Sequence, residues 1–239
     1  MPSEANAEGG TPLPAIEPDV DLNEPMDTKE NAEFKQVYHG FDHMTWYVGN
    51  AKQAASYYIT RMGFNEIAYR GIETGDRHMA SHVVSNGKAR FVFISLLNAP
   101  NFATAISESV QDENVDNCRV NEIHEHISKH GDGVKDIAFQ VDDVYGVWNK
   151  AVAQGARSVS KPRTIKDEDG ELVVAVVSTY GDTTHTLIDR SKYKGAFMPG
   201  YSCVDGEDPI NKYLPKVEVV EIDHCVGNQP WDGLEPAVE

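Results

Sequence analysis

The chain has 239 residues, which is enough for one large domain or two small ones, and its 40% hydrophobic content is ordinary for a globular protein. A formal net charge of −17 disfavours a nucleic-acid partner, and no apolar run approaches the roughly 18 residues that a membrane-spanning helix needs. The three cysteines are scattered and lack Cys-x-x-Cys spacing, so reduced thiols in a cytoplasmic protein are expected rather than a disulfide or zinc framework.

The N-terminal segment carries much of the negative charge. Residues 1–33 hold nine acidic side chains against one basic side chain, together with five of the twelve prolines. Such a segment cannot bury enough apolar surface to offset the entropy lost on ordering. We therefore expect residues 1–37 to form a disordered acidic tail.

The first predicted unit has the order β-α-β-β-β. Residues 41–48 have the β-branched and aromatic content of a strand, and a helix is expected to begin after Asn50 and to end at Gly63. Three more strands are expected to follow, and the last two are joined by the hairpin turn Asn86-Gly87. These strands are predicted at residues 64–69, 79–84 and 90–97.

The same order returns after a helix that is expected over residues 120–130. Residues 134–141 are predicted to form a strand, Asp142 or Asp143 is expected to cap the next helix, and Gly155 is expected to end it. The strands that complete this unit are predicted at residues 157–160, 172–179 and 185–189.

The repeat predicts one N-terminal domain over residues 38–190, with modules at about 41–97 and 134–190. Residues 191–216 contain glycine, proline and charge, and are predicted to be a linker between domains.

A third copy is expected to open near the C-terminus. Residues 217–224 are predicted to form its first strand, because "IDHCVGN" at 222–228 repeats much of "FDHMTWYVGN" at 41–50. Residues 217–239 are therefore expected to be the incomplete start of a further, C-terminal domain.

Four sequence motifs resemble those of a known family and occur in the same order along the chain. They are "GFNEIAYRGIETGDR" at 63–77, "HGDGVKDIAFQVDDV" at 130–144, "FMPGY" at 197–201 and "VEIDHCVGNQP" at 220–230. The paired modules resemble the vicinal-oxygen-chelate fold, an α+β fold in which βαβββ modules form a half-open barrel around a metal. Within that superfamily, these stretches resemble 4-hydroxyphenylpyruvate dioxygenase, particularly its fungal members. The resemblance runs from about Tyr38 to Trp231.

The resemblance implies an Fe(II)-dependent dioxygenase that converts 4-hydroxyphenylpyruvate and O₂ to homogentisate and CO₂ in tyrosine and phenylalanine catabolism. In that family two histidines and one glutamate hold the iron, and this set leaves positions open for a 2-oxo acid and O₂. The first histidine matches His224, and a side chain facing the active-site cavity matches Val226. The other two ligands are expected beyond Glu239, so the resemblance implies that residues 217–239 are the incomplete start of a C-terminal iron-binding domain. The 239-residue chain alone is therefore expected to be inactive, and the full-length parent is expected to be cytoplasmic, with homodimerisation as a further expectation.

The N-terminal modules have different residues at the equivalent positions. His43 matches the first ligand, Asp136 falls where the second histidine would be, and Thr186 falls about where the glutamate would be. Because threonine is a weak, neutral ligand, we expect these modules to be a metal-free scaffold. A vestigial site for a hard cation is the alternative.

Two other histidine pairs have a spacing that places them on one face of an element. His126 and His130 are four residues apart on an expected helix, and His78 and His82 lie in a strand-like stretch. Neither pair has an evident third ligand, so both are predicted to be exposed and without function.

Two alternatives to the dioxygenase remain open. One is hydroxymandelate synthase, which shares the fold, the iron and the substrate. The other is a non-catalytic scaffold or binding module with the same fold.

Overall fold

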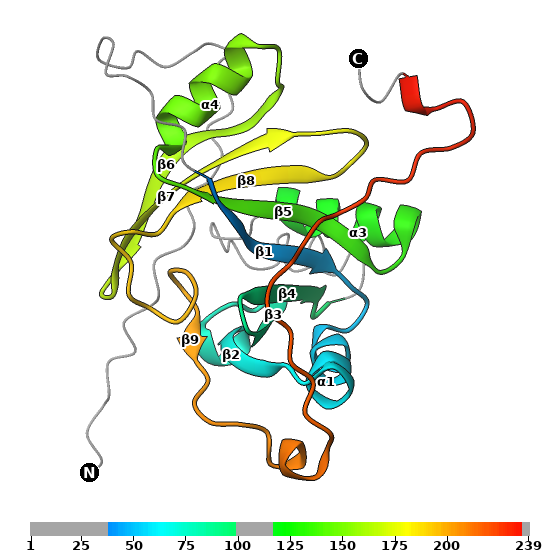
Figure 1. Ribbon diagram of the computed structural model, residues 1–239, viewed down its shortest axis with the longest axis vertical. Coiled ribbons are helices and arrows are strands. Elements are labelled where there is room, and N and C mark those ends of the chain that lie inside the picture. The colour runs from blue at the N-terminus through cyan, green and yellow to red at the C-terminus, as the bar shows by residue number, and fades with distance from the viewer. Residues whose placement is uncertain (1–37, 99–116, 236–239) are drawn as a thin grey trace, which may run out of the picture.

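The computed structural model describes residues 38–98 and 117–235 (Figure 1), so the expected acidic tail lies outside the described residues. Nine strands form one mixed sheet in the order β6-β7-β8-β5-β1-β4-β3-β2-β9. The strands are β1 (Tyr38–Tyr47), β2 (Asn65–Arg70), β3 (Met79–Asn86), β4 (Ala89–Leu96), β5 (Gly133–Val141), β6 (Ser158–Asp167), β7 (Gly170–Ser178), β8 (Thr184–Asp189) and β9 (Ser202–Cys203).

Eight of these strands belong to two modules of the same order. The first module is β1-α1-β2-β3-β4 and the second is β5-α4-β6-β7-β8, where α1 is Ala51–Met62 and α4 is Val144–Ala153. Each module places its first strand parallel to its last, β1 beside β4 and β5 beside β8. The modules are joined at the centre of the sheet, where β1 pairs antiparallel with β5. This arrangement confirms the expected α+β fold of paired βαβββ modules.

Helix α1 begins and ends where its sequence predicts. The Asn50 side chain accepts a hydrogen bond from the backbone N–H of Gln53 at 3.0 Å, and Gly63 takes the left-handed conformation (φ 68°) that glycine adopts without steric cost. The helix packs one face against β3 and β4. Its small side chains Ala51 and Ala55 let it lie close to the sheet, and Phe93 of β4 is buried beneath it.

Helix α4 covers the equivalent face of the second module. Asp143 caps it by accepting a hydrogen bond from the Gly146 backbone N–H at 2.9 Å. Trp148 on this helix is fully buried and packs over the strand residues Ala175 and Leu187. A large aromatic side chain between two layers therefore dominates the core of this module.

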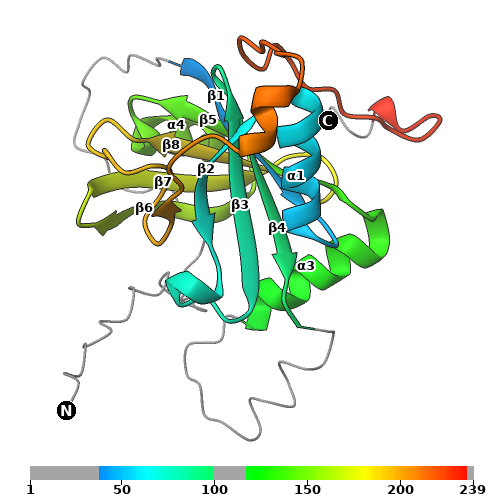
Figure 2. The same ribbon diagram turned by 90° about the horizontal axis from the view of Figure 1, so that it is seen from below.

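The opposite face of the sheet, which we call the inner face, is covered by α3 (Asn117–His130) and by residues 191–201. Ile123 of α3 and Phe197 of the loop are both fully buried in one cluster with Tyr47 of β1. Met198 packs against this cluster and also against the inner-face cluster of the second module. Figure 2 shows α3 crossing beside the strands of the first module. The inner face is thus a filled core that spans both modules.

A buried carboxylate links the inner face to the loop that covers it. A bulge in the β1–β5 pairing lies between Phe41 and His43, and both Asp42 and His43 are buried. Asp42 accepts hydrogen bonds from Arg190 Nε (2.6 Å) and Nη2 (2.7 Å), while Arg190 Nη1 donates to the Phe197 carbonyl (2.6 Å). Arg90 approaches the same carboxylate at 3.5 Å. A single acid therefore ties β1 to β4 and to the segment after β8.

The structure differs from the sequence expectations in three places. Strand β6 continues to Asp167, well past the expected end at residue 160. Residues 191–203, expected as part of a linker, pack onto the sheet, and Ser202–Cys203 pair with β2. The strand expected over 217–224 is wrong, because this segment has no ladder partner among the described residues and follows an extended path.

We predict that Trp148→Ala lowers the free energy of unfolding by about 3–5 kcal/mol, because it opens a large cavity under α4. Trp231 is a matched control, since its side chain is 99% exposed, and Trp231→Ala should change stability by less than about 0.5 kcal/mol. Urea unfolding followed by circular dichroism measures both values. Equal effects of the two substitutions would contradict the packing described.

We also predict that Asp42→Asn destabilises the protein by about 3–5 kcal/mol at pH 7, because it leaves buried Arg190 without its counter-charge. Burial alone would raise the pKa of the Asp42 carboxyl, but the hydrogen bonds and charges of His43 and Arg190 outweigh burial and hold this pKa well below its usual range. The stabilisation is therefore fully present above about pH 4 and decreases as the pH falls below that value.

Urea midpoints at pH 7 and at pH 3 test this behaviour, and the difference between wild type and Asp42→Asn should narrow at the lower pH. Asp142→Asn is the control, because Asp142 pairs with His39 at the exposed surface and should matter little. A difference that stays constant from pH 7 to pH 3 would show that Asp42 is not the titrating group.

Candidate metal centre

The histidine expected to bind iron lies on the C-terminal segment, away from the inner face. Its side chain is 72% exposed, and its Nδ1 atom lies 2.8 Å from Oδ2 of the neighbouring Asp223. Val226, expected to face a cavity, is 74% exposed. The roles assigned to His224 and Val226 stay predictions, since the described residues place no other ligand beside them.

The segment that carries His224 is held by the turn between β3 and β4. The Asn86 side chain donates to the Val217 carbonyl at 2.8 Å and accepts from the Val219 N–H at 3.2 Å, so one amide substitutes for a strand partner. The Lys88 N–H donates to the Val220 carbonyl at 2.8 Å. These bonds involve residues 217–220 and do not reach His224, whose side chain is exposed.

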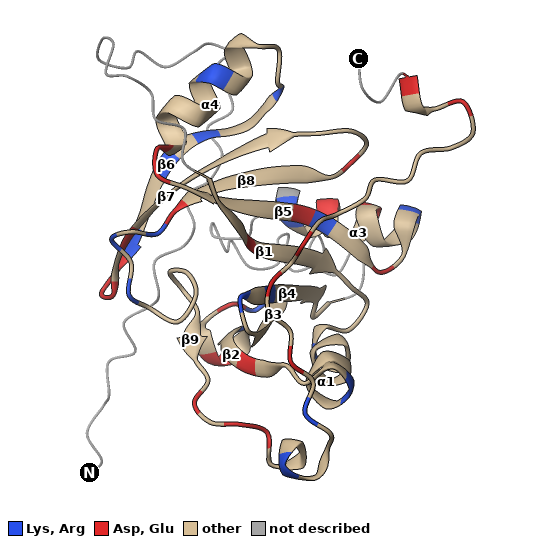
Figure 3. Ribbon diagram, in the orientation of Figure 1, with Lys and Arg blue, Asp and Glu red and all other residues tan. Residues whose placement is uncertain are grey.

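Acidic residues dominate this part of the chain. Residues 204–235 hold eight acids against two bases, and Figure 3 shows several of the acids along the path from β9 through η2 (Pro209–Tyr213) to the C-terminus. One of them, Glu221, pairs with Lys88 of the β3–β4 turn at 3.3 Å. The surroundings of His224 therefore attract a cation and repel a free anion.

The three N-terminal positions that match the ligand set do come together on the inner face. His43 on β1 pairs with Ala138 of β5, and Ala138 in turn pairs with Thr186 of β8. Asp136 lies on β5 two residues before Ala138, and Thr184 Oγ1 donates to its carboxylate at 2.6 Å. The equivalence between the modules predicted from sequence therefore holds in space.

These inner-face residues do not fit an iron centre. His43 uses its Nδ1 atom at Asp42, 2.6 Å away. Burial raises the pKa of Asp136, while hydrogen bonds from Thr184 and Thr186 and the charge of His43 oppose that rise. Each polar group is thus engaged in a structural network. Within residues 38–98 and 117–235, no three His, Cys, Asp or Glu side chains are grouped so as to hold a metal ion.

Two histidines that were expected at the surface are buried. His82 is 8% exposed because its Nδ1 atom pairs with Glu66 at 2.6 Å beneath the ring of Tyr69. His126 on α3 is 7% exposed, and its ring packs in a T-shaped contact with the ring of Tyr47, with the ring centres 5.3 Å apart. Neither burial could be predicted from sequence, because each depends on partners that are distant in the chain.

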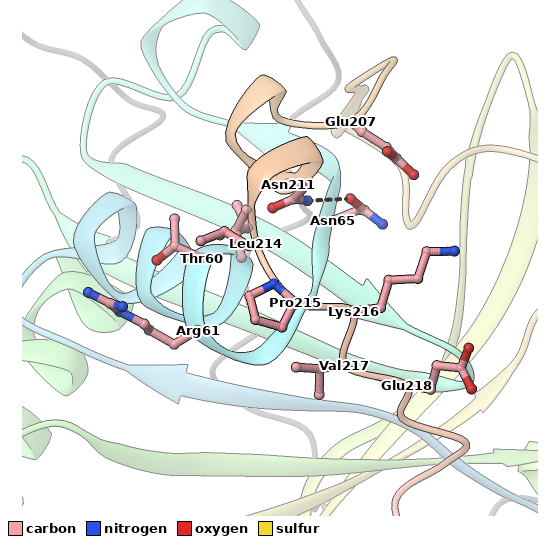
Figure 4. A pocket seen from close by; sticks show the side chains of 12 residues that line it. Thr60, Arg61, Asn65, Glu207, Asn211, Leu214, Pro215, Lys216, Val217 and Glu218 are labelled. Atoms are coloured by element: carbon pink, nitrogen blue, oxygen red, sulfur yellow. Dashed lines mark hydrogen bonds between the residues drawn. The ribbon is translucent and has the colours of Figure 1, made fainter.

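A cleft of about 440 Å³ lies between α1 and the segment that follows β9 (Figure 4). A hydrogen bond of 3.0 Å between the side chains of Asn211 and Asn65 spans one end of it. Its lining contains no histidine or cysteine, and its charged members are of both signs: Arg61, Glu207, Lys216 and Glu218. This composition does not suit catalysis or a transition metal, and the cleft is better described as the seam between the helix and the segment.

Comparison with known proteins identifies the fold family. Residues 40–188 match the model of the Glyoxalase/Bleomycin resistance protein/Dioxygenase superfamily. The solved structure of a mutant 4-hydroxymandelate synthase from Streptomyces coelicolor aligns with a TM-score of 0.53 at 24% identity, over 69% of this chain and 41% of that chain. At that identity the likeness supports the fold alone. No helix in the described part of the chain is long and apolar enough to cross a membrane.

Curated relatives are much closer in sequence. A protein named probable 4-hydroxyphenylpyruvate dioxygenase 2 from Aspergillus fumigatus is 53% identical over 84% of this chain and 50% of its own length. The 4-hydroxyphenylpyruvate dioxygenase of Coccidioides posadasii is 54% identical over 83% of this chain and 48% of its own length. The chain thus spans about half the length of these relatives. It belongs to the glyoxalase/bleomycin resistance protein/dioxygenase superfamily, and the resemblance to fungal 4-hydroxyphenylpyruvate dioxygenases is confirmed.

Proposed function

We propose that this chain forms the scaffold half of an Fe(II)-dependent 4-hydroxyphenylpyruvate dioxygenase and supplies one iron ligand, His224. In the complete protein the reaction would convert 4-hydroxyphenylpyruvate and O₂ to homogentisate and CO₂. The observation that supports this most strongly is the identity of 53% over 84% of the chain with a relative of that name. The substrate and O₂ are the partners that this activity requires.

The structure of the inner face supports a structural role for the N-terminal modules and a catalytic site elsewhere. Loop residue Phe197 fills the space in front of His43, with the two rings 5.0 Å apart, and Arg90 and Arg190 each lie 5.8 Å from the centre of the Phe197 ring. A side chain in this position leaves no open face on His43 for a substrate. The N-terminal pair of modules therefore serves as a rigid support, and the chemistry takes place where His224 is completed by other ligands.

A bound Fe(II) would supply positions at which a 2-oxo acid and O₂ can meet. This chain would contribute to that centre the imidazole of His224, whose Nδ1 contacts Asp223. That contact leaves Nε2 as the nitrogen that can bind the metal. One imidazole cannot fix Fe(II) by itself, so the isolated chain is proposed to be inactive.

We predict that the 239-residue chain does not retain Fe(II) through gel filtration and forms no homogentisate from 4-hydroxyphenylpyruvate with added Fe(II) and O₂. Iron is measured by a colorimetric chelator and product by chromatography. Stoichiometric iron that is lost in His224→Ala, or turnover above the iron-only background, would overturn the proposal that His224 needs further ligands. It would favour a complete site within this chain.

In a protein of the relatives' full length that contains this sequence, His224→Ala should reduce turnover at least a thousandfold and remove iron. The fold of residues 38–203 should be unaffected, because the His224 side chain is largely exposed. His39→Ala is a matched control, since His39 is another exposed histidine paired with an aspartate. It should keep full activity. Full activity in His224→Ala would refute the ligand assignment.

A further inference from the structure

A second cleft, of about 370 Å³, lies between α3 and the second module. It adjoins the inner-face network at Thr184, which lines the cleft and donates to Asp136, and its lining includes no residue of the His224 segment. Side chains of both signs line it, with three bases and three acids: Lys129, Lys135 and Arg157, and Glu122, Glu125 and Asp182. Because these charges balance, the cleft has no net field that would exclude an ion of either sign.

His126 projects from α3 into this cleft. It is 7% exposed, and neither of its ring nitrogens has a hydrogen-bond partner among the described residues. Burying an imidazole with both nitrogens unpaired costs free energy, and such a group in a folded protein calls for a ligand. Burial lowers the pKa of His126, and the charges of His130 and Lys135 lower it further.

Two further donors lie beside His126. His130 follows it by one helical turn, and the two ring centres are 4.9 Å apart. Asp182, from the turn between β7 and β8, places Oδ2 2.8 Å from Nε2 of His130. The sequence showed the two histidines four residues apart, but only the fold brings the carboxylate to them. Lys129 also contacts Asp182, through a side chain that is 66% exposed and free to move away.

We propose that His126, His130 and Asp182 bind a divalent transition-metal ion of the zinc class. Two imidazoles and one carboxylate are donors that zinc prefers, and at zinc–nitrogen distances of about 2.0–2.1 Å two tetrahedral imidazole ligands have ring centres about 5.2 Å apart. The observed spacing of 4.9 Å is close to that value. Two donor atoms on such an ion lie about 3.3 Å apart, so the contact between His130 and Asp182 needs to open by only about half an ångström.

Binding requires small rearrangements. In the described part of the chain, no three His, Cys, Asp or Glu side chains already have the arrangement of a metal site. The His126 side chain must therefore rotate to direct a ring nitrogen toward the ion. Asp182 must exchange Lys129 for the ion. The fourth position of the ion would face the cleft and solvent.

Isothermal titration of the 239-residue chain with ZnCl₂ tests the proposal, and one ion should bind per chain. Asp182→Asn and His130→Ala should each weaken binding at least tenfold. His126→Phe keeps a ring against Tyr47 without the two unpaired nitrogens, so it should raise the melting temperature in the absence of zinc and abolish binding. Wild-type affinity in any of these three variants would overturn the site.

His39→Ala is the matched control, because His39 with Asp142 is an exposed histidine–carboxylate pair outside the cleft. It should bind zinc as the wild type does. Loss of zinc in His224→Ala, with retention in His130→Ala, would place the ion at the C-terminal segment and overturn the proposal. The test measures zinc alone and no turnover, so its result is independent of the proposed dioxygenase function.

Discussion

The antiparallel pairing of β1 with β5 is the contact on which the rest of the structure depends. It joins two modules that would each expose an apolar face, and it leaves one continuous inner face that must be covered. Helix α3 and residues 191–201 supply the cover, and the carboxylate of Asp42 fixes it through Arg190. Burying the Asp42 carboxylate without partners would cost free energy, so the contact with Arg190 must be kept. Arg190 also donates to the Phe197 carbonyl, which holds the loop in this position. A rigid, filled N-terminal scaffold is the consequence.

Much of this fold could be predicted from the sequence because local signals and the repeat agreed. Asn50 and Gly63 bounded α1 as expected, and the modules were visible as two copies of one order. The errors occurred where non-local pairing decides structure. Residues 217–224 have strand-forming composition, yet without a partner ladder they stay extended, held by the side chain of Asn86. The packing of Phe197 against His43 was likewise invisible, since it depends on the Asp42–Arg190 pair.

The candidate sites show the same limit. The grouping of His43, Asp136 and Thr186 followed from the family resemblance, with His43 and Asp136 on the first strands of the two modules and Thr186 on β8 beside β5. The cluster of His126, His130 and Asp182 did not follow, because the helix spacing gave two donors and only the β7–β8 turn brings the third. Burial of His126 also depends on the distant Tyr47. The spacing of two histidines on one helix can be predicted from sequence, whereas a carboxylate that reaches them from another element cannot.

The central claim is that the iron of the complete dioxygenase lies at His224 and that the N-terminal modules support it without binding it. Anomalous diffraction at the iron edge, from crystals of a full-length protein grown with Fe(II), tests this directly. The account predicts a strong anomalous peak within bonding distance of His224 Nε2 and none beside His43 and Asp136. A peak on the inner face, with none at His224, would contradict it.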